Sequence, residues 1–440
     1  MDFGVIAALV VLIAFLLFGV HIHTTLFAVG IVGIWAMGMG DILPTFLGTQ
    51  TFPSVASYAL TTIPMFVLAA QFILGAGIID DMYNAVYNMS KGKKGPLAYV
   101  TVILGALLGA VCGVGTASAS ALGKVAVPQL KKHGYDYGIA GAIAAVSGGL
   151  SAIIPPSIVI VVYGIIAETS ISQMFAGAIL PGIIIVGIYI SFIAVYNKLR
   201  ENKLKREGKL PDKQEEFHKI PVDKKRARIS LIFGLLIIVI IFGGIYSGFC
   251  TPTEAGALAA LVGFIAALVL KKVNKKFIID AAVDTLRTSS MIMVIMVAAK
   301  VLGKFISLSQ LARDFIRSLE PLMGTPELVL FIMLGVYFLG FMLMDGTAVI
   351  LMTTPFMIPL ITEMGYDPVW FGVLVCILLV LGAVTPPVGI DVYAVSGVSR
   401  IAPKIIFKPA MAIAGVTTII IGAIMIFWPE VALLLPRLIS

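Results

Sequence analysis

Long apolar runs separated by short polar segments dominate this chain. One membrane crossing takes about 20 apolar residues, and ten apolar runs of 16 to 33 residues are candidates for such crossings. They fall at 3–20, 25–40, 61–79, 138–167, 172–197, 229–249, 253–270, 288–306, 367–399 and 409–430. The pattern predicts an all-α polytopic membrane protein, because helices keep every backbone hydrogen bond within one segment of a bilayer.

Two further apolar segments, 95–130 and 325–363, are too long for one crossing and are interrupted centrally by glycine. Basic residues flank the first of them on both sides: Lys91, Lys93 and Lys94 before it, and Lys131, Lys132 and His133 after it. Since basic flanks favour the cytoplasmic side, both ends are expected there, which makes the segment a re-entrant hairpin. Irregular backbone at membrane depth lines a cavity or is buried in protein, so each hairpin tip is expected to face a site.

The spans divide the chain into two halves of opposite orientation. We predict a first repeat over 1–197, a cytoplasmic linker over 198–228 and a second, inverted repeat over 229–440, with the second hairpin entering from the opposite face. Amphipathic stretches at 81–92 and 276–289 are expected to be arms that link moving parts. The linker holds twelve Lys or Arg. Its charge is typical of a cytoplasmic loop.

Internal sequence similarity supports the two halves. A shift of 231 residues aligns 115–156 with 346–387 without gaps and gives twelve identities in 42 positions. The shared residues include glycines, the triplet Gly134-Tyr135-Asp136 with Gly365-Tyr366-Asp367, and two Pro-Pro pairs. Inverted repeats with broken helices are typical of secondary transporters.

Each half combines a hairpin tip with a Pro-Pro break in the following span, at 138–167 and 367–399. Proline removes a backbone donor, so nearby carbonyl oxygens need another partner, and a sodium ion is one. The first predicted sodium site comprises Gly113, Gly115, Thr116, Ser118, Ser151, Ile154 and Pro156. The second comprises Asp345, Gly346, Thr347, Gly382, Thr385 and Val388. The alternative is a pair of proline kinks satisfied by neighbouring helices and water.

The hairpin tips also direct helix N-termini at the expected cavity. Such ends carry partial positive charge and suit an anionic substrate. The predicted substrate-binding residues are Thr116, Ser120, Ser157, Asp345, Thr347 and Asp391. Asp345 is equally well interpreted as the N-cap of the second hairpin arm. Lys124 is ionisable too, but it can extend to the cytoplasmic face.

Composition narrows the classes further. The chain of 440 residues is 60% hydrophobic and 12% charged, with a net charge of +8 and a mean hydropathy of +1.07. The basic excess lies largely in a few loops, so topology explains it better than nucleic-acid binding. Three cysteines and four histidines form no metal motif, and no nucleophile elbow occurs, so no enzyme is predicted. The N-terminus has no basic region ahead of its first apolar run, which is expected to be a retained span.

The chain resembles the large membrane subunit of the tripartite ATP-independent periplasmic (TRAP) transporters over essentially its whole length. The most specific matches are Ile153-Ile154-Pro155-Pro156-Ser157, Phe249-Cys250-Thr251-Pro252-Thr253-Glu254-Ala255 and Val384-Thr385-Pro386-Pro387-Val388-Gly389, together with the stretch from Phe175 to Gly182. The first tip departs from the family by having less serine, which favours backbone over side-chain ligation there.

The resemblance implies an elevator mechanism in a bacterial inner membrane, with sodium ions as coupling ions and no organic cofactor. It implies two protein partners, a small membrane subunit of about four spans and a soluble periplasmic substrate-binding protein. It also implies an organic-acid substrate, such as a C4-dicarboxylate, sialic acid, a sugar acid or a keto acid. A stand-alone ion-coupled carboxylate or anion carrier of the same fold is the alternative.

Overall fold

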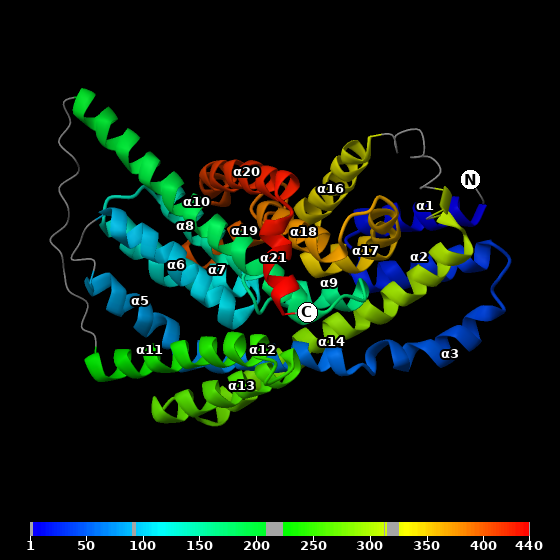
Figure 1. Ribbon diagram of the computed structural model, residues 1–440, viewed down its shortest axis with the longest axis horizontal. Helices are drawn as coiled ribbons and strands as arrows, with labels where there is room; N and C mark the ends of the chain where they lie inside the picture. Colours follow the sequence, from blue (N-terminus) through cyan, green and yellow to red (C-terminus); the bar gives the residue numbers. More distant parts are fainter. Residues whose placement is uncertain (1–2, 90–93, 208–222, 312, 315–324, 440) are drawn as a thin grey trace.

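The chain folds into helices throughout the part that the computed structural model describes, residues 3–89, 94–207, 223–311, 313–314 and 325–439 (Figure 1). Eight helical segments in this part are long and apolar enough to cross a membrane. They are Tyr58–Ala76, Ile171–Arg206, Lys224–Tyr246, Pro252–Val269, Lys275–Leu308, Pro326–Leu343, Gly346–Glu363 and Pro403–Phe427. The predicted all-α membrane protein is therefore confirmed.

One group of helices, the outer group, contains segments from the beginning of both halves. Its members are α1 (Phe3–Leu17), α2 (Ile22–Ala36), α3 (Ile42–Val55), α4 (Thr62–Ala76), α11 (Lys224–Ile238), α13 (Pro252–Val269) and α14 (Lys275–Leu308). Helix α14 contacts α2, α3 and α4, and α13 contacts α4 and α11. Helices α11 and α13 run along the lower side of Figure 1, and α14 rises from the lower centre toward the right.

A second group, the inner group, holds both hairpins and both broken helices. Its members are α6 (Lys94–Cys112), α7 (Gly115–Lys132), α8 (Tyr137–Gly149), α9 (Ile158–Ile166), α16 (Pro326–Leu343), α17 (Gly346–Glu363), α18 (Pro368–Gly382), α19 (Ile390–Ser399) and α20 (Pro403–Phe427). The long helix α10 (Ile171–Arg206) and the terminal helix α21 (Glu430–Leu438) pack on this group. The two groups meet where α4 and α14 contact α6, α9 and α17.

The structure repeats at the spacing that the sequence predicts. The second hairpin arms, α7 and α17, start at Gly115 and Gly346 and end at Lys132 and Glu363, so both ends are displaced by 231 residues (346 − 115 and 363 − 132). The two hairpins lie on opposite sides of Figure 1, α6 and α7 to the left and α16 and α17 to the right. Pro155-Pro156 and Pro386-Pro387 are both cis.

The shared Gly-Tyr-Asp triplet joins each hairpin to its broken helix. The glycine takes a left-handed conformation, with φ of 79° at Gly134 and 77° at Gly365, which glycine adopts without a steric cost. The aspartate then caps the next helix, because Asp136 accepts a hydrogen bond from the Ile139 amide and Asp367 accepts one from the Val369 amide. The triplet is thus a helix stop followed by a helix start.

Several predicted boundaries are wrong. The stretch 276–289 is not a separate arm, because Lys275–Leu308 is one continuous helix, and neither glycine nor proline interrupts the sequence between 276 and 289. The predicted linker is partly helical, since α10 continues to Arg206 and α11 begins at Lys224; residues 208–222 of the linker and 90–93 of the first arm lie outside the described residues. Helices α3 and α21 were not predicted.

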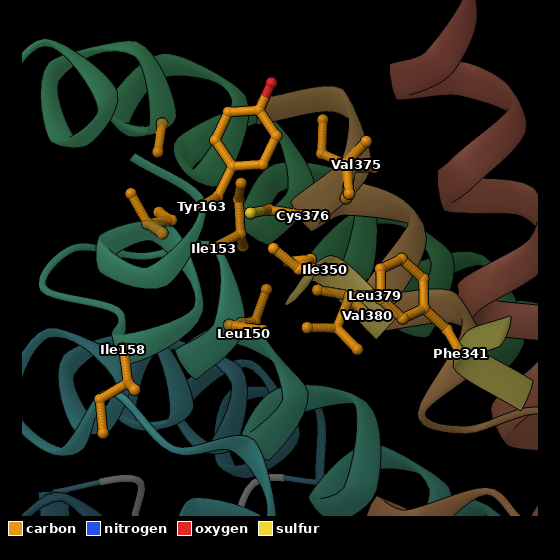
Figure 2. Packing of buried hydrophobic residues seen from close by; sticks show 14 of the residues in the cluster. Leu150, Ile153, Ile158, Tyr163, Phe341, Ile350, Val375, Cys376, Leu379 and Val380 are labelled. Atoms are coloured by element: carbon orange, nitrogen blue, oxygen red, sulfur yellow. The ribbon is translucent and has the colours of Figure 1, made fainter. Parts of the chain in front are cut away.

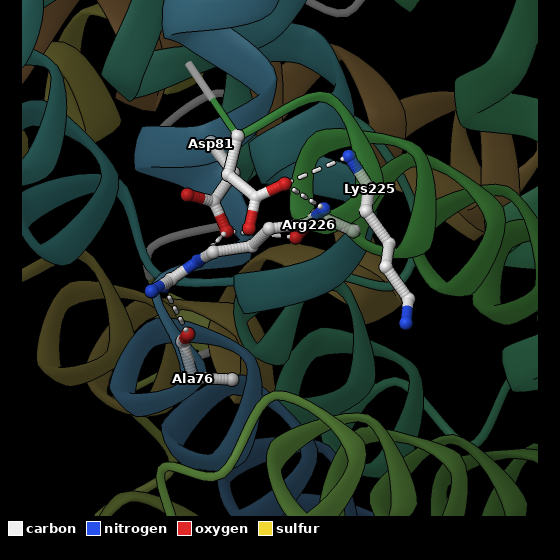
Figure 3. Close-up of polar contacts among 6 residues, drawn as sticks. Ala76, Asp81, Lys225 and Arg226 are labelled. Carbon is white, nitrogen blue, oxygen red and sulfur yellow. Dashed lines mark hydrogen bonds and ion pairs between the residues drawn. The ribbon is translucent and has the colours of Figure 1, made fainter. Parts of the chain in front are cut away.

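The stretch predicted as the first arm lies largely on the helix α5 (Ile78–Met89), and polar contacts hold the start of this helix to α11 (Figure 3). The Arg226 Nε donates to Asp81 Oδ2 at 2.8 Å, and the Ser230 hydroxyl donates to the same oxygen at 2.8 Å. Asp223 caps α11 by accepting from the Lys225 amide. One end of the arm is therefore fastened to the outer group, while α5 also contacts α6 and α7 of the inner group.

Candidate functional site

The tips of both hairpins open into one cavity of about 270 Å³. The first tip contributes Gly113 to Thr116, and the second contributes Asp345 to Thr347. The broken helices add Gly149, Ala152, Ala383 and Asp391, and α14 of the outer group adds Thr288, Met291 and Ile292. The cavity thus lies where the two repeats and the two helix groups come together.

Glycine at the first tip is a geometric requirement. Gly113 has a φ of +61°, and a Cβ there would lie 2.7 Å from the carbonyl oxygen of Pro156. Its own carbonyl oxygen accepts a hydrogen bond of 3.3 Å from the Ile158 amide. The tip is therefore joined by backbone contacts to the first break, as predicted from the sequence.

The first break is held by hydroxyl groups. The Ser151 hydroxyl donates to the Ser118 hydroxyl oxygen at 2.7 Å, and both side chains are fully buried. The Ser157 hydroxyl donates to the carbonyl oxygen of Ala152 and accepts from the Ile160 amide, so it caps α9. Apolar side chains of both repeats enclose this region (Figure 2). No ionisable side chain takes part in these hydrogen bonds.

The second tip uses a carboxylate. Asp345 Oδ1 accepts hydrogen bonds from the Thr347 amide at 2.9 Å and the Ala348 amide at 3.4 Å, so Asp345 is the N-cap of α17. The capping interpretation of Asp345 is confirmed. Asp345 also lines the cavity, so capping leaves its second carboxylate oxygen available. A Cβ on Gly346 would lie 2.5 Å from Leu379, which explains glycine there.

The second break lies against the end of α16. The Val388 amide donates to the carbonyl oxygen of Met342 at 3.3 Å. The Thr385 hydroxyl donates to the carbonyl oxygen of Leu381 at 2.7 Å, and the Asp391 amide donates to the carbonyl oxygen of Ala383 at 3.0 Å. These contacts fix α19 so that Asp391, which is only 2% exposed, faces the cavity.

Most predicted site residues come together, with informative exceptions. Thr116, Asp345, Thr347 and Asp391 line the cavity, whereas Ser120 and Ser157 do not. Around the first break, the structure groups Gly113, Gly115, Thr116, Ser118, Ser151, Ile154 and Pro156. Of the second set, Asp345, Gly346 and Thr347 line the cavity, whereas Gly382 and Val388 lie against the end of α16 and the Thr385 hydroxyl donates to Leu381.

The sequence analysis did not predict that α14 contributes to the wall of the cavity. The sequence carries a signal for it, since Thr288, Ser289 and Ser290 are three successive hydroxyl residues inside an otherwise apolar span. Such residues at membrane depth need hydrogen-bonding partners, which a polar cavity supplies.

Lys124 does not belong to the site. Its residue is exposed on α7, and its charge acts on Asp80 at the start of α5. Burial raises the pKa of Asp80 above its ordinary value, and the nearby ammonium of Lys124 opposes part of that rise. The described residues also contain no cluster of three or more His, Cys, Asp or Glu that could hold a metal ion.

A polytopic helical protein with paired hairpin tips around a central cavity is a secondary transporter by its architecture. The family model "Tripartite ATP-independent periplasmic transporter, DctM component" matches residues 9–439. The chain therefore belongs to the DctM family, the large membrane subunits of TRAP transporters.

Known proteins support this assignment. The isethionate TRAP transporter permease protein DctMQ of Oleidesulfovibrio alaskensis is 30% identical over 388 residues, which are 88% of this chain and 59% of that longer protein. The 2,3-diketo-L-gulonate TRAP transporter large permease protein YiaN of Escherichia coli is 30% identical over 363 residues, 82% of this chain and 83% of that protein. The crystal structure of the Alcanivorax borkumensis YdaH transporter shares the fold, with a TM-score of 0.65 at 15% identity, covering 88% of this chain and 90% of that one.

Proposed function

We propose that this chain imports an organic acid together with sodium ions across the bacterial inner membrane, as the large subunit of a three-part transporter. The observation that carries the proposal is the cavity between the two tips, at which the N-termini of α7 and α17 converge. Each N-terminus presents roughly half a positive charge, which favours an anionic group. The residues that we expect to contact the substrate are Thr116, Thr347 and the tip backbones.

Sodium coupling is supported by the oxygen-rich breaks beside the cavity. Unwound backbone next to short helix ends is the usual place for coupling ions in such transporters. At the first break, Ser118 and Ser151 hold their hydroxyl groups together in the interior. At the second, Asp345 adds carboxylate oxygen atoms at the cavity, and the Thr385 hydroxyl adds an oxygen atom at the break itself. The two breaks are therefore our two candidate sodium sites.

An elevator movement is supported by the division of the helices. The inner group contains both tips and both breaks, so it can carry a bound substrate as one unit. The outer group lines the cavity only through Thr288, Met291 and Ile292 of α14. A movement of the inner group past α14 would expose the cavity to one side and then to the other. The arm α5, fastened by Asp81 and Arg226, would link the groups.

The proposed partners are a small membrane subunit of about four spans and a soluble periplasmic protein that delivers the substrate. Family membership supports both. The substrate class follows from the helix N-termini and from the names of the two relatives, which state isethionate and 2,3-diketo-L-gulonate. Both compounds are organic acids, and the proposal for this chain is limited to that class.

Uptake of radiolabelled organic acids into proteoliposomes tests the proposal. The liposomes contain this chain and its small subunit, and uptake is measured with and without an inward sodium gradient and with and without the binding protein. We expect uptake only when the sodium gradient and the binding protein are both present. Uptake that needs the sodium gradient but not the binding protein would favour a stand-alone carrier. Uptake that proceeds equally well without a sodium gradient would contradict sodium coupling.

A further inference from the structure

A second pocket, of about 260 Å³, lies between the two helix groups. Its walls come from α3 and α14 of the outer group and from α9 and α17 of the inner group. Its charged lining residues are Lys300 and Lys304, and Gln50 adds a side-chain amide. Among the described residues that line the central cavity, none is a lysine, arginine or histidine. Positively charged side chains that attract an organic acid are therefore found in this pocket and not in the cavity lining.

The pocket and the central cavity follow one another along the same three helices, because residues of α9, α14 and α17 line both spaces. From the cavity to the pocket, the lining advances from Ile158 to Ile166 on α9, from Ile292 to Lys300 on α14 and from Gly346 to Pro355 on α17. Each step is eight or nine residues (166 − 158, 300 − 292 and 355 − 346), or about 12–14 Å of helix. The two spaces therefore lie in series between the helix groups.

The pocket lies on the outer side of the cavity. Helix α14 begins beside a basic cluster, Lys271, Lys272, Lys275 and Lys276, and such a cluster indicates the cytoplasmic end of a span. The later residues of α14, Lys300 among them, lie toward the opposite face. In Figure 1, α3 and α17 lie to the right, whereas the basic end of α10 lies at the upper left. An acid that arrives from outside therefore meets this pocket before the cavity.

Lys300 and Lys304 lie inside the apolar run 288–306 of α14. Charged side chains within a span are costly and as a rule mark functional sites. The two lysines are four residues apart on one face of the helix, where like charges repel. No described acidic residue forms an ion pair with either ammonium, and Lys304 Nζ lies 5.8 Å from the centre of the Phe46 ring. An anion bound between the two ammonium groups would remove their repulsion.

We propose that Lys300 and Lys304, with Gln50, form an outer binding site for the acid group of the substrate, which occupies this pocket before it enters the central cavity. The inference rests on the proposed import of an organic acid. The inner group is proposed to move past α14, and an outward movement by the spacing of the two spaces would bring the hairpin tips opposite the lysines. The acid would then pass from the pocket to the tips over a short distance.

Uptake kinetics of the complete transporter test this site. Proteoliposomes contain this chain and its small subunit, and the binding protein is varied after loading with radiolabelled succinate, N-acetylneuraminate, 2,3-diketo-L-gulonate or isethionate. We expect Lys300→Gln and Lys304→Gln each to raise the half-saturating concentration about threefold, as for a partly exposed charge contact, with the maximal rate unchanged. Lys300→Arg and Lys304→Arg keep the charge and should stay near the wild type. Lys276→Gln is the matched control, because Lys276 is exposed on the same helix at its cytoplasmic end.

Acetylation of the lysines distinguishes direct contact with the acid from other causes. The reconstituted wild type is treated with an amine-reactive acetylating reagent, and mass spectrometry measures the modification of Lys300, Lys304 and the control Lys276. We expect the loaded binding protein to slow acetylation of Lys300 and Lys304 several-fold and to leave Lys276 unchanged. The empty binding protein is the second control, because docking alone would shield the two lysines equally with and without the acid.

The outcomes separate this inference from the proposed function. A wild type that takes up none of the four acids would contradict the proposed function, and this site with it. Normal uptake with an unchanged half-saturating concentration in the double variant would overturn the outer site alone. Equal protection by the empty and the loaded binding protein would also overturn it. Protection that depends on phosphatidylglycerol in the liposomes, and not on the acid, would assign the pocket to a lipid headgroup and overturn the inference.

Discussion

The two hairpin tips share an architecture but differ in chemistry. Helices α7 and α17 start at equivalent positions, yet Val114 precedes the first and Asp345 precedes the second. The first break is joined by a hydrogen bond between two serine hydroxyls, whereas the two carboxyl groups that line the cavity, those of Asp345 and Asp391, both belong to the second repeat. The two repeats therefore share their backbone arrangement but differ in the side chains at the cavity. Those of the first repeat are uncharged, whereas the second repeat contributes two aspartates.

The sharpest test of this comparison makes the first tip resemble the second. Val114→Asp would place a third carboxyl group on the cavity, and like charges close together in a partly buried site repel one another. We expect the initial uptake rate to fall by more than tenfold. Val114→Asn, which caps α7 without charge, is the control. Equal rates for the two variants would show that charge at the first tip is unimportant.

A bulky residue at the second tip should have the next largest effect. A Cβ on Gly346 already lies 2.5 Å from Leu379, so Gly346→Leu would push α17 away from α18. Overpacking costs about 1–3 kcal/mol, and we expect uptake to fall about tenfold while the protein still inserts. Gly415→Leu is the control, because no atom lies within 4 Å of that Cβ position. Normal uptake by Gly346→Leu would contradict the role of this tip.

Thr385→Val tests the hydroxyl at the second break. The change keeps the shape of the side chain and removes the group that donates to Leu381. We expect the half-saturating sodium concentration to rise by about fivefold, the equivalent of about 1 kcal/mol for one hydrogen-bonding group. Thr385→Ser should stay near the wild type. An unchanged sodium dependence in Thr385→Val would remove this residue from the second sodium site.

The smallest effect is expected at the neutral first break. Ser118→Ala and Ser151→Ala each remove one partner of a buried hydrogen bond, at a cost of about 1 kcal/mol. In a double-mutant cycle, the double variant should be little less stable in detergent than either single variant. Strictly additive losses of thermal stability would show that the two hydroxyls act independently.

The parts of the fold that repeat were predictable, because glycine and proline mark them locally. Gly134 and Asp136 stop one helix and start the next, and their counterparts at Gly365 and Asp367 do the same. Such signals need no knowledge of distant contacts. The predicted hairpins and breaks are accordingly confirmed to within a few residues.

The contribution of α14 could not be predicted in the same way. Thr288 reaches the cavity only because α14 packs between α4 and α17, and these contacts join segments far apart in the chain. The first turns of α14 are amphipathic and resemble an interfacial arm, although no glycine or proline separates them from the span that follows. Whether Asp345 caps a helix or lines a cavity was also undecidable from the sequence, and it does both.

Labelling of single cysteines would test most directly whether both tips serve one substrate cavity. Thr116→Cys and Thr347→Cys, in a chain whose native cysteines are replaced, would be reacted with a membrane-permeant maleimide. We predict that substrate with sodium slows labelling several-fold at both positions, and that it leaves Thr49→Cys, an exposed position on α3, unaffected. Protection of one tip alone, or of neither, would contradict a shared cavity.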